Sequence, residues 1–341
     1  MGKVTLGRTK LVTDKNGFGA LPIQRISVED AGYLLQKAYE NGITYFDTAR
    51  AYTDSEEKIG KALSGVRNHI ILATKTAAKD ADGFWRDMET SLQLLKTDFI
   101  DVYQFHNPPF CPKPGGADGL YDAALKAREQ GKIRFIGITN HHYKVAKEAV
   151  ESGLYDTLQF PFNYLSTDIE RSLVEMCRER EVGFLAMKAL SGGLLTNASA
   201  CYAYLDQYAH VLPLWGIQKE SELDEFIEFM KNPPSMDEER KALIEKDIRA
   251  LSGEFCRGCG YCMPCPMGIE INNCARMSLL LRRSPSAQWL SEDWQKNMAK
   301  IKDCIHCNQC AAKCPYHLNT PELLGKNLAD YENVLKDGLN A

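Results

Sequence analysis

Eight cysteines near the C-terminus fall into two closely spaced runs. The second reads C-x2-C-x2-C-x3-C-P, and the first is the same run with one residue fewer before its last cysteine. Three thiolates at this spacing can wrap one face of a [4Fe-4S] cluster, and the run is typical of cluster-binding segments. The sequence therefore predicts two [4Fe-4S] clusters. Their expected ligands are Cys256, Cys259, Cys262 and Cys265 in the first run, and Cys304, Cys307, Cys310 and Cys314 in the second.

The division of these ligands between clusters follows from the proline after the fourth cysteine of each run. That cysteine points away from its own three and usually binds the other cluster. The expected sets are Cys256, Cys259, Cys262 with Cys314, and Cys304, Cys307, Cys310 with Cys265. The division stays open, because Cys274 lies nearby and the first run is short. Zinc is a rival, since paired cysteines also make four-thiolate sites, whereas a disulfide framework fits such tight runs poorly.

Length and composition are those of an ordinary globular protein. The chain has 341 residues, is 44% hydrophobic and 25% charged, and carries a net charge of -4, which argues against a nucleic-acid surface. We expect no membrane span, because no apolar stretch is long enough, and residues 1–11 lack an apolar core of signal-peptide length. Twelve cysteines without a targeting signal indicate a reducing cytoplasmic location. Cys111, Cys177 and Cys201 are interpreted as ordinary thiols.

The first two thirds of the chain alternate short apolar stretches with amphipathic ones. Regular βα alternation with near-continuous apolar strands indicates a parallel sheet. Eight units in about 220 residues favour a closed (β/α)8 TIM barrel over an open sheet, and no G-x-G-x-x-G follows the first strand. The expected strands lie at 17–21, 43–47, 70–74, 99–105, 134–139, 157–161, 182–188 and 212–217. The expected helices include 28–41, 56–64, 84–95, 121–130, 145–152 and 169–179.

The remaining third predicts a second, small domain. We expect the barrel at 1–231, a linker at 232–252 and the cluster domain at 253–341. Helical patterns at 273–281 and 291–301 separate the two cysteine runs, and a last helix is expected at 321–338, with Pro321 at its first position. A helical spacer of this length is typical of a mainly α-helical dicluster ferredoxin-like domain.

Polar residues close three consecutive apolar strands of the predicted barrel. Asp47, Lys75 and His106 stand there, and Tyr52 follows on the loop after Asp47. In such barrels the carboxyl ends of the strands and the loops after them carry the chemistry. Each residue has an ordinary structural interpretation on its own, as a helix cap, a surface charge or a core histidine. Four titratable groups converging on one mouth instead favour a catalytic site.

These segments resemble the aldo-keto reductase family, in the branch with a C-terminal ferredoxin-type domain. The resemblance rests on F-D-T-A-R-A-Y from Phe46, A-T-K ending at Lys75 and Q-F-H ending at His106. It implies a catalytic tetrad of Asp47, Tyr52, Lys75 and His106. A tyrosine can protonate the alkoxide that forms on a carbonyl if a neighbouring ammonium lowers its pKa. Lys75, held by Asp47, fits that role, and His106 can orient the carbonyl oxygen.

The same resemblance implies a nicotinamide cofactor, NADP or NAD. Thr139, Asn140 and Gln159 match residues that grip the nicotinamide carboxamide in the family. Met187 stands where an aromatic ring is common, and Lys188 is in reach of the pyrophosphate. The segment from Gly216 includes Lys219, but two glutamates there would repel a 2′-phosphate, so NAD stays open beside NADP.

Three functions remain open at this stage. The first is an NAD(P)H-dependent reductase of a small-molecule carbonyl, or the reverse oxidation of an alcohol, with clusters outside the hydride path. The second is an electron-transfer oxidoreductase in which ferredoxin or another carrier feeds the clusters and they feed a flavin or substrate in the barrel. The third, a cluster-bearing sensor without catalysis, is disfavoured by the intact tetrad. The proline-rich loop at 107–120 is expected to shape the substrate side.

Overall fold

The computed structural model describes residues 2–251, 255–283 and 286–338. It divides the chain into two compact units, one of Met1–Ala189 with Cys201–Met236 and one of Leu190–Ala200 with Asp237–Ala341. The expected domain boundaries stay predictions, and residues 252 and 253, where the linker was expected to end and the cluster domain to begin, lie outside the described residues. The loop at 190–200 thus groups with the C-terminal part of the chain.

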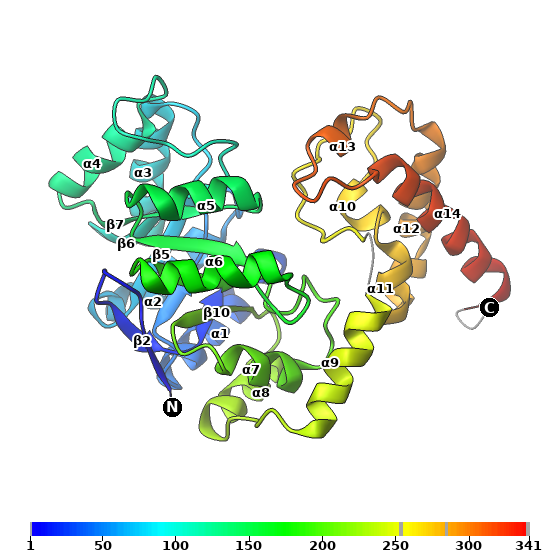
Figure 1. Cartoon of the computed structure of the whole chain (residues 1–341), viewed down its shortest axis with the longest axis horizontal. Coiled ribbons are helices and arrows are strands. Elements are labelled where there is room, and N and C mark those ends of the chain that lie inside the picture. Colours follow the sequence, from blue (N-terminus) through cyan, green and yellow to red (C-terminus); the bar gives the residue numbers. More distant parts are fainter. Residues whose placement is uncertain (1, 252–254, 284–285, 339–341) are drawn as a thin grey trace. The chain divides into compact units, whose positions relative to one another are not determined.

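The first unit contains a closed barrel of eight parallel strands, as predicted. The strand order is β10-β3-β4-β5-β6-β7-β8-β9, and helices surround the strands (Figure 1). The strands are β3 (Gly17–Gly19), β4 (Tyr45–Asp47), β5 (Ile71–Thr76), β6 (Ile100–His106), β7 (Ile133–Thr139), β8 (Thr157–Pro161), β9 (Gly183–Met187) and β10 (Val211–Gly216). Each lies at a position that the apolar pattern predicts.

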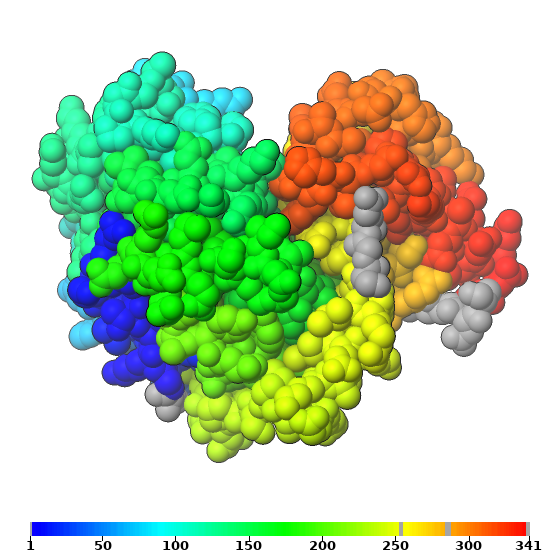
Figure 2. Space-filling view, viewed as in Figure 1, coloured from blue at the N-terminus to red at the C-terminus, as the bar shows by residue number. Residues whose placement is uncertain are grey.

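The helices between the strands begin and end where capping residues occur. The Ser27 side chain accepts a hydrogen bond from the backbone N–H of Asp30, and Thr167 forms a capping box with Glu170. Gly153 follows α5 with a φ of 70°, which a glycine adopts without strain. The helices are α1 (Val28–Glu40), α2 (Ser55–Leu63), α3 (Ala81–Leu95), α4 (Leu120–Glu129), α5 (Tyr143–Ser152), α6 (Asp168–Glu179), α7 (Ala198–Asp206) and α8 (Glu220–Lys231), with 3-10 turns η1 (Pro22–Arg25) and η2 (Ser64–His69). On the face shown in Figure 2, the segment that includes α5 and α6 forms much of this unit's surface.

An N-terminal hairpin, which the sequence analysis did not predict, packs against the barrel. Its antiparallel strands are β1 (Lys3–Thr5) and β2 (Val12–Asp14). Val4, Leu6 and Leu11 join a buried cluster with residues such as Tyr45 and Leu212, which lie near the amino ends of their strands. The hairpin therefore covers the amino end of the barrel, and the carboxyl end is left for a site.

The second unit is helical, in agreement with the predicted spacer and last helix. Its helices are α9 (Glu238–Ala250), α10 (Ile271–Cys274), α11 (Met277–Arg283), α12 (Glu292–Ala299), α13 (Gln309–Ala312) and α14 (Thr320–Asp337), with 3-10 turns η3 (Ser286–Leu290) and η4 (Lys300–Asp303). Helix α9 lies in the segment expected to be a linker. No helix among the described residues is long and apolar enough to cross a membrane.

Candidate active site and cysteine-lined cavities

The strand register brings the predicted catalytic residues to one end of the barrel. Asp47 is the last residue of β4, and His106 is the last residue of β6. Between them, Lys75 of β5 pairs in register with Gln104 of β6. Since parallel strands end on the same side, these side chains share the carboxyl mouth.

Asp47 and Lys75 form a buried ion pair. The Lys75 Nζ donates to Asp47 Oδ1 at 2.8 Å and to Oδ2 at 2.7 Å, and to the carbonyl oxygen of Thr48 at 2.6 Å. Lys75 is 1% exposed and Asp47 3%. Burial raises the pKa of Asp47 and lowers that of Lys75, while their mutual attraction opposes both shifts. Contact between the two members thus opposes the effect of burial on each charge.

Two glutamines complete the surroundings of the Asp47 carboxylate. Gln104 Nε2 donates to Asp47 Oδ1 at 3.3 Å and to Gln159 Oε1 at 3.0 Å, and Gln159 Nε2 donates to Asp47 Oδ2 at 3.3 Å. Gln159 was predicted as a nicotinamide contact, and here it also supports the ion pair. The supporting role of Gln104 was missed, although it stands two residues before His106.

Tyr52 and His106 lie beside this pair. The Lys75 Nζ is 5.3 Å from the centroid of the Tyr52 ring, and the rings of Tyr52 and His106 meet edge to face with centroids 5.8 Å apart. Burial, with the charge of Lys75 second, lowers the pKa of His106 to about 3. His106 is therefore a neutral imidazole at ordinary pH, able to orient an oxygen atom by a hydrogen bond.

The loop from Asp47 to Tyr52 is anchored from behind by a buried glutamate. Glu56, 1% exposed, accepts hydrogen bonds from Thr74 Oγ1 at 2.6 Å and Ser91 Oγ at 2.7 Å. It also pairs with the guanidinium of Arg50, which lies on the loop itself. The first turn of α2 thereby fixes the backbone that carries Tyr52.

The residues predicted to hold the nicotinamide lie on neighbouring strand ends. Thr139 Oγ1 is 3.7 Å from the sulfur of Met187. Asn140 Nδ2 donates to the Pro108 carbonyl at 2.9 Å. Lys188 follows β9 with a φ of 59°, and its carbonyl accepts from Asn163. The Thr139 hydroxyl could form a hydrogen bond with the carboxamide of a nicotinamide, and the polarisable Met187 thioether could pack against its aromatic ring.

His141 is a further buried group at this mouth that the sequence analysis missed. It is 5% exposed, and its backbone N–H donates to Asn107 Oδ1 at 3.0 Å. Burial, followed by the charge of Lys188, lowers its pKa well below the ordinary value. The sequence signal that could have pointed to His141 is its position directly after Asn140, a predicted cofactor residue.

The start of α8, next to the predicted cofactor residues Gly216 and Lys219, already holds a carboxylate. Glu222 Oε2 accepts from the backbone N–H of Gln218 at 2.9 Å and of Lys219 at 3.1 Å. A negative charge at a helix start is stabilised there. The same charge would oppose the dianionic 2′-phosphate that distinguishes NADP from NAD.

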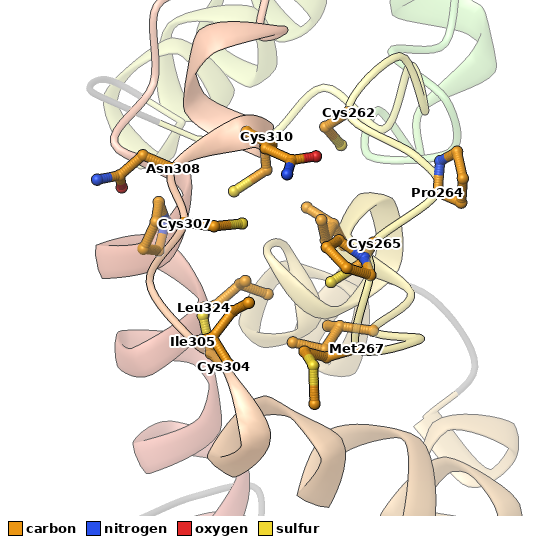
Figure 3. A pocket seen from close by; sticks show the side chains of 15 residues that line it. Cys262, Pro264, Cys265, Met267, Cys304, Ile305, Cys307, Asn308, Cys310 and Leu324 are labelled. Carbon is orange, nitrogen blue, oxygen red and sulfur yellow. The ribbon is translucent and has the colours of Figure 1, made fainter.

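In the second unit, the cysteine runs surround two cavities. The first is lined by Cys256, Cys259, Cys262 and Cys314, with Ile271 and Leu318 among the other residues. The second is lined by Cys262, Cys265, Cys304, Cys307 and Cys310, with Met267, Ile305 and Leu324 (Figure 3). The side chains of Cys265, Cys307 and Cys310 point toward one space in Figure 3. The expected ligand sets are thus brought together, with Cys262 reaching both cavities.

The chemistry of these cavities fits iron–sulfur clusters. Each offers four or more thiols in an otherwise largely apolar lining, and thiolates are the ligands of such clusters. Within the described parts of the chain, no three metal-binding side chains converge on a point for a single ion. Cys274 lines neither cavity and is fully buried, and burial raises its pKa to about 12. Cys111, Cys177 and Cys201 are buried and lie outside the two runs.

The closed (β/α)8 barrel thus carries an Asp–Lys pair, a tyrosine and a histidine at its carboxyl mouth. The chain belongs to the aldo-keto reductase family, whose model matches residues 13–203. A second model, that of the 4Fe-4S dicluster domain, matches residues 255–319. The helical C-terminal region therefore carries a ferredoxin-like 4Fe-4S domain.

Individual relatives match part of the chain. The aldo-keto reductase YhdN of Bacillus subtilis is 36% identical over 181 residues, covering 48% of this chain and 53% of its own length. The methylglyoxal reductase YeaE of Escherichia coli is 29% identical over 206 residues, covering 54% of this chain and 70% of its own. This chain thus spans about half the length of YhdN.

A solved structure supports the fold. The aldo-keto reductase of Klebsiella pneumoniae, in complex with NADP and acetate, aligns with a TM-score of 0.60 at 20% identity, over 72% of this chain and 94% of its own. Identity at that level supports the barrel architecture alone.

Proposed function

We propose that the chain reduces a small-molecule carbonyl to an alcohol, or catalyses the reverse oxidation, with Tyr52 as the proton donor. The observation that carries this proposal is the buried Asp47–Lys75 pair beside the Tyr52 ring, with a neutral His106 against its edge. The methylglyoxal reductase among the relatives supports a small carbonyl as the substrate.

The chemistry divides among the four side chains. A bound reduced nicotinamide supplies the hydride to the carbonyl carbon. The Tyr52 hydroxyl gives its proton to the oxygen of the forming alcohol, and the Lys75 ammonium stabilises the phenolate that remains. Asp47 holds Lys75 in its charged form. His106 is half-buried and neutral because desolvation lowers its pKa, and it donates a hydrogen bond that directs the carbonyl oxygen toward Tyr52.

Residues at the strand ends would hold the nicotinamide. Thr139, Asn140 and Gln159 supply polar groups for its carboxamide, Met187 a polarisable surface for its ring, and Lys188 a positive charge for the pyrophosphate. NADP is the nucleotide bound in the Klebsiella structure, and it is one of the two nucleotides proposed here. The negative charge of Glu222 disfavours binding of the 2′-phosphate and the positive charge of Lys219 favours it. Both NADPH and NADH are therefore proposed cofactors.

An anaerobic titration tests the proposal. We expect NADPH or NADH to bind at one site per chain and to leave the visible absorption of the clusters unchanged. Adding methylglyoxal should then oxidise the nucleotide. Failure of both nucleotides to bind would contradict the proposal.

We also propose that the eight cysteines of the two runs bind two [4Fe-4S] clusters. Protein purified without oxygen is then expected to contain about eight iron atoms per chain. Cys314→Ser should lower this to about four, because the first cavity loses a ligand while the second keeps its own.

Cys274→Ser is the matched control for the iron measurement. Cys274 is buried in the same unit and lines neither cavity, so iron content should stay at about eight atoms. An equal loss of iron in both variants would contradict the assignment of ligands.

One observation favours a second candidate function, electron transfer from a carrier such as ferredoxin. Ile305 is 60% exposed and the neighbouring Cys307 is exposed, so the second cavity opens to the protein surface. A cluster there would be accessible to a one-electron partner. Bleaching of the cluster absorption by the nucleotide in the titration above would favour this candidate.

A further inference from the structure

The backbone of the loop that follows β9 departs from extended and right-handed helical geometry at several residues. Lys188, Ser191, Gly192 and Gly193 have φ values of 59°, 49°, 65° and 89°, all in the left-handed region. Two turn hydrogen bonds within the loop both end on the Leu190 carbonyl. For the non-glycine residues this conformation is unfavourable and persists only when surrounding groups fix it.

Two arginines of the second unit supply such groups. Arg276 Nη1 donates to the Gly192 carbonyl at 3.2 Å, and Arg283 Nη1 donates to the Leu194 carbonyl at 3.2 Å. Arg283 is itself held by Asp247 at 2.8 Å. Both arginines flank or belong to α11, and the loop they contact belongs to the same compact unit.

Arg276 also contacts the first cysteine run. Gly258, between Cys256 and Cys259, has a φ of 63°, and a Cβ built there would lie 2.5 Å from the Arg276 Cζ. The guanidinium thus packs directly on the backbone of Gly258. The Gly258 N–H in turn points to the Cys256 sulfur at 3.4 Å. One side chain therefore contacts both the run and the loop.

We propose that Arg276 is a positioning residue that connects the first cysteine run to the loop after β9, so that a cluster in that run orders the loop. This inference rests on the proposed function, in which Met187 and Lys188, immediately before the loop, hold the nicotinamide nucleotide. It gives the cluster a role in nucleotide binding without a place in the hydride path.

The test compares Arg276→Ala with wild type, both with their clusters. In hydrogen exchange, amides 190–195 should exchange faster in the variant. The Kd and KM for the nucleotide should rise about tenfold, as for the loss of one charge-assisted hydrogen bond, with kcat unchanged. The potential of the first cluster should also become more negative, because a positive charge has been removed. Iron content should stay the same.

Arg282→Ala is the matched control. Arg282 lies on α11 but pairs with Asp330 at 2.7 Å, so its loss should change none of these quantities. Gly258→Ala provides a second route, because its Cβ would displace the guanidinium and should speed exchange in the same amides.

The outcomes separate the inference from the function on which it rests. Unchanged exchange of amides 190–195 in Arg276→Ala would overturn the inference, and so would loss of iron, since Arg276 would then serve cluster binding itself. If wild type binds neither nucleotide, the proposed function fails, while the exchange data still decide whether Arg276 orders the loop.

Discussion

Replacing Tyr52 by phenylalanine is expected to lower kcat for carbonyl reduction by about 100- to 10,000-fold, the usual contribution of a positioned proton donor. The substitution removes one oxygen atom and leaves the ring between Lys75 and His106. The Kd for the nucleotide should therefore stay within about twofold of wild type. Steady-state kinetics and a binding titration on the same preparation measure both quantities.

Tyr39→Phe serves as the control for this experiment. Tyr39 lies on α1 and is not one of the four site residues, so its substitution should leave kcat unchanged. If Tyr52→Phe kept more than about a tenth of the wild-type kcat, the proton would have another source and Tyr52 would not be the donor.

Replacing Lys75 by methionine is expected both to abolish turnover and to destabilise the barrel. Methionine roughly preserves the volume but leaves the Asp47 carboxylate buried without its cation. Breaking a buried pair from one side costs about 3–5 kcal/mol. Urea unfolding, followed by circular dichroism, should show this loss in the free energy of unfolding.

The double variant Asp47→Asn with Lys75→Met separates stability from catalysis. The neutral side-chain amide at position 47 can still accept a hydrogen bond from Gln104 or Gln159, so no unpaired charge remains in the core. Part of the lost stability should return, whereas turnover should stay absent. A Lys75→Met variant with the same free energy of unfolding as wild type would show that the Asp47–Lys75 ion pair does not stabilise the barrel.

Periodicity and strand endings account for what the sequence predicted of the fold. The eight strands occur at the predicted positions because each is a short apolar segment between capped helices. The sequence could predict that Asp47, Lys75 and His106 lie at one mouth, because the carboxyl ends of parallel strands lie at the same end of a barrel whatever the conformation of the loops.

Long-range contacts account for what the sequence left out. The N-terminal hairpin depends on Val4, Leu6 and Leu11 reaching the barrel core, and its short strands carry little local signal. Gln104 supports Asp47 across 57 positions of sequence. The contacts of the loop at 190–200 with the C-terminal unit include those of Arg276 with Gly192 and of Arg283 with Leu194, which are 84 and 89 residues apart in sequence.

The most direct test of the central claim follows a label from the nucleotide to the product. Holoprotein purified without oxygen is mixed with NADPH deuterated at the transferable position of the nicotinamide and with methylglyoxal, while the visible spectrum is recorded. We predict deuterium on the carbinol carbon of the product and unchanged cluster absorption. Product without deuterium, formed while the cluster absorption bleaches, would contradict direct hydride transfer in the barrel.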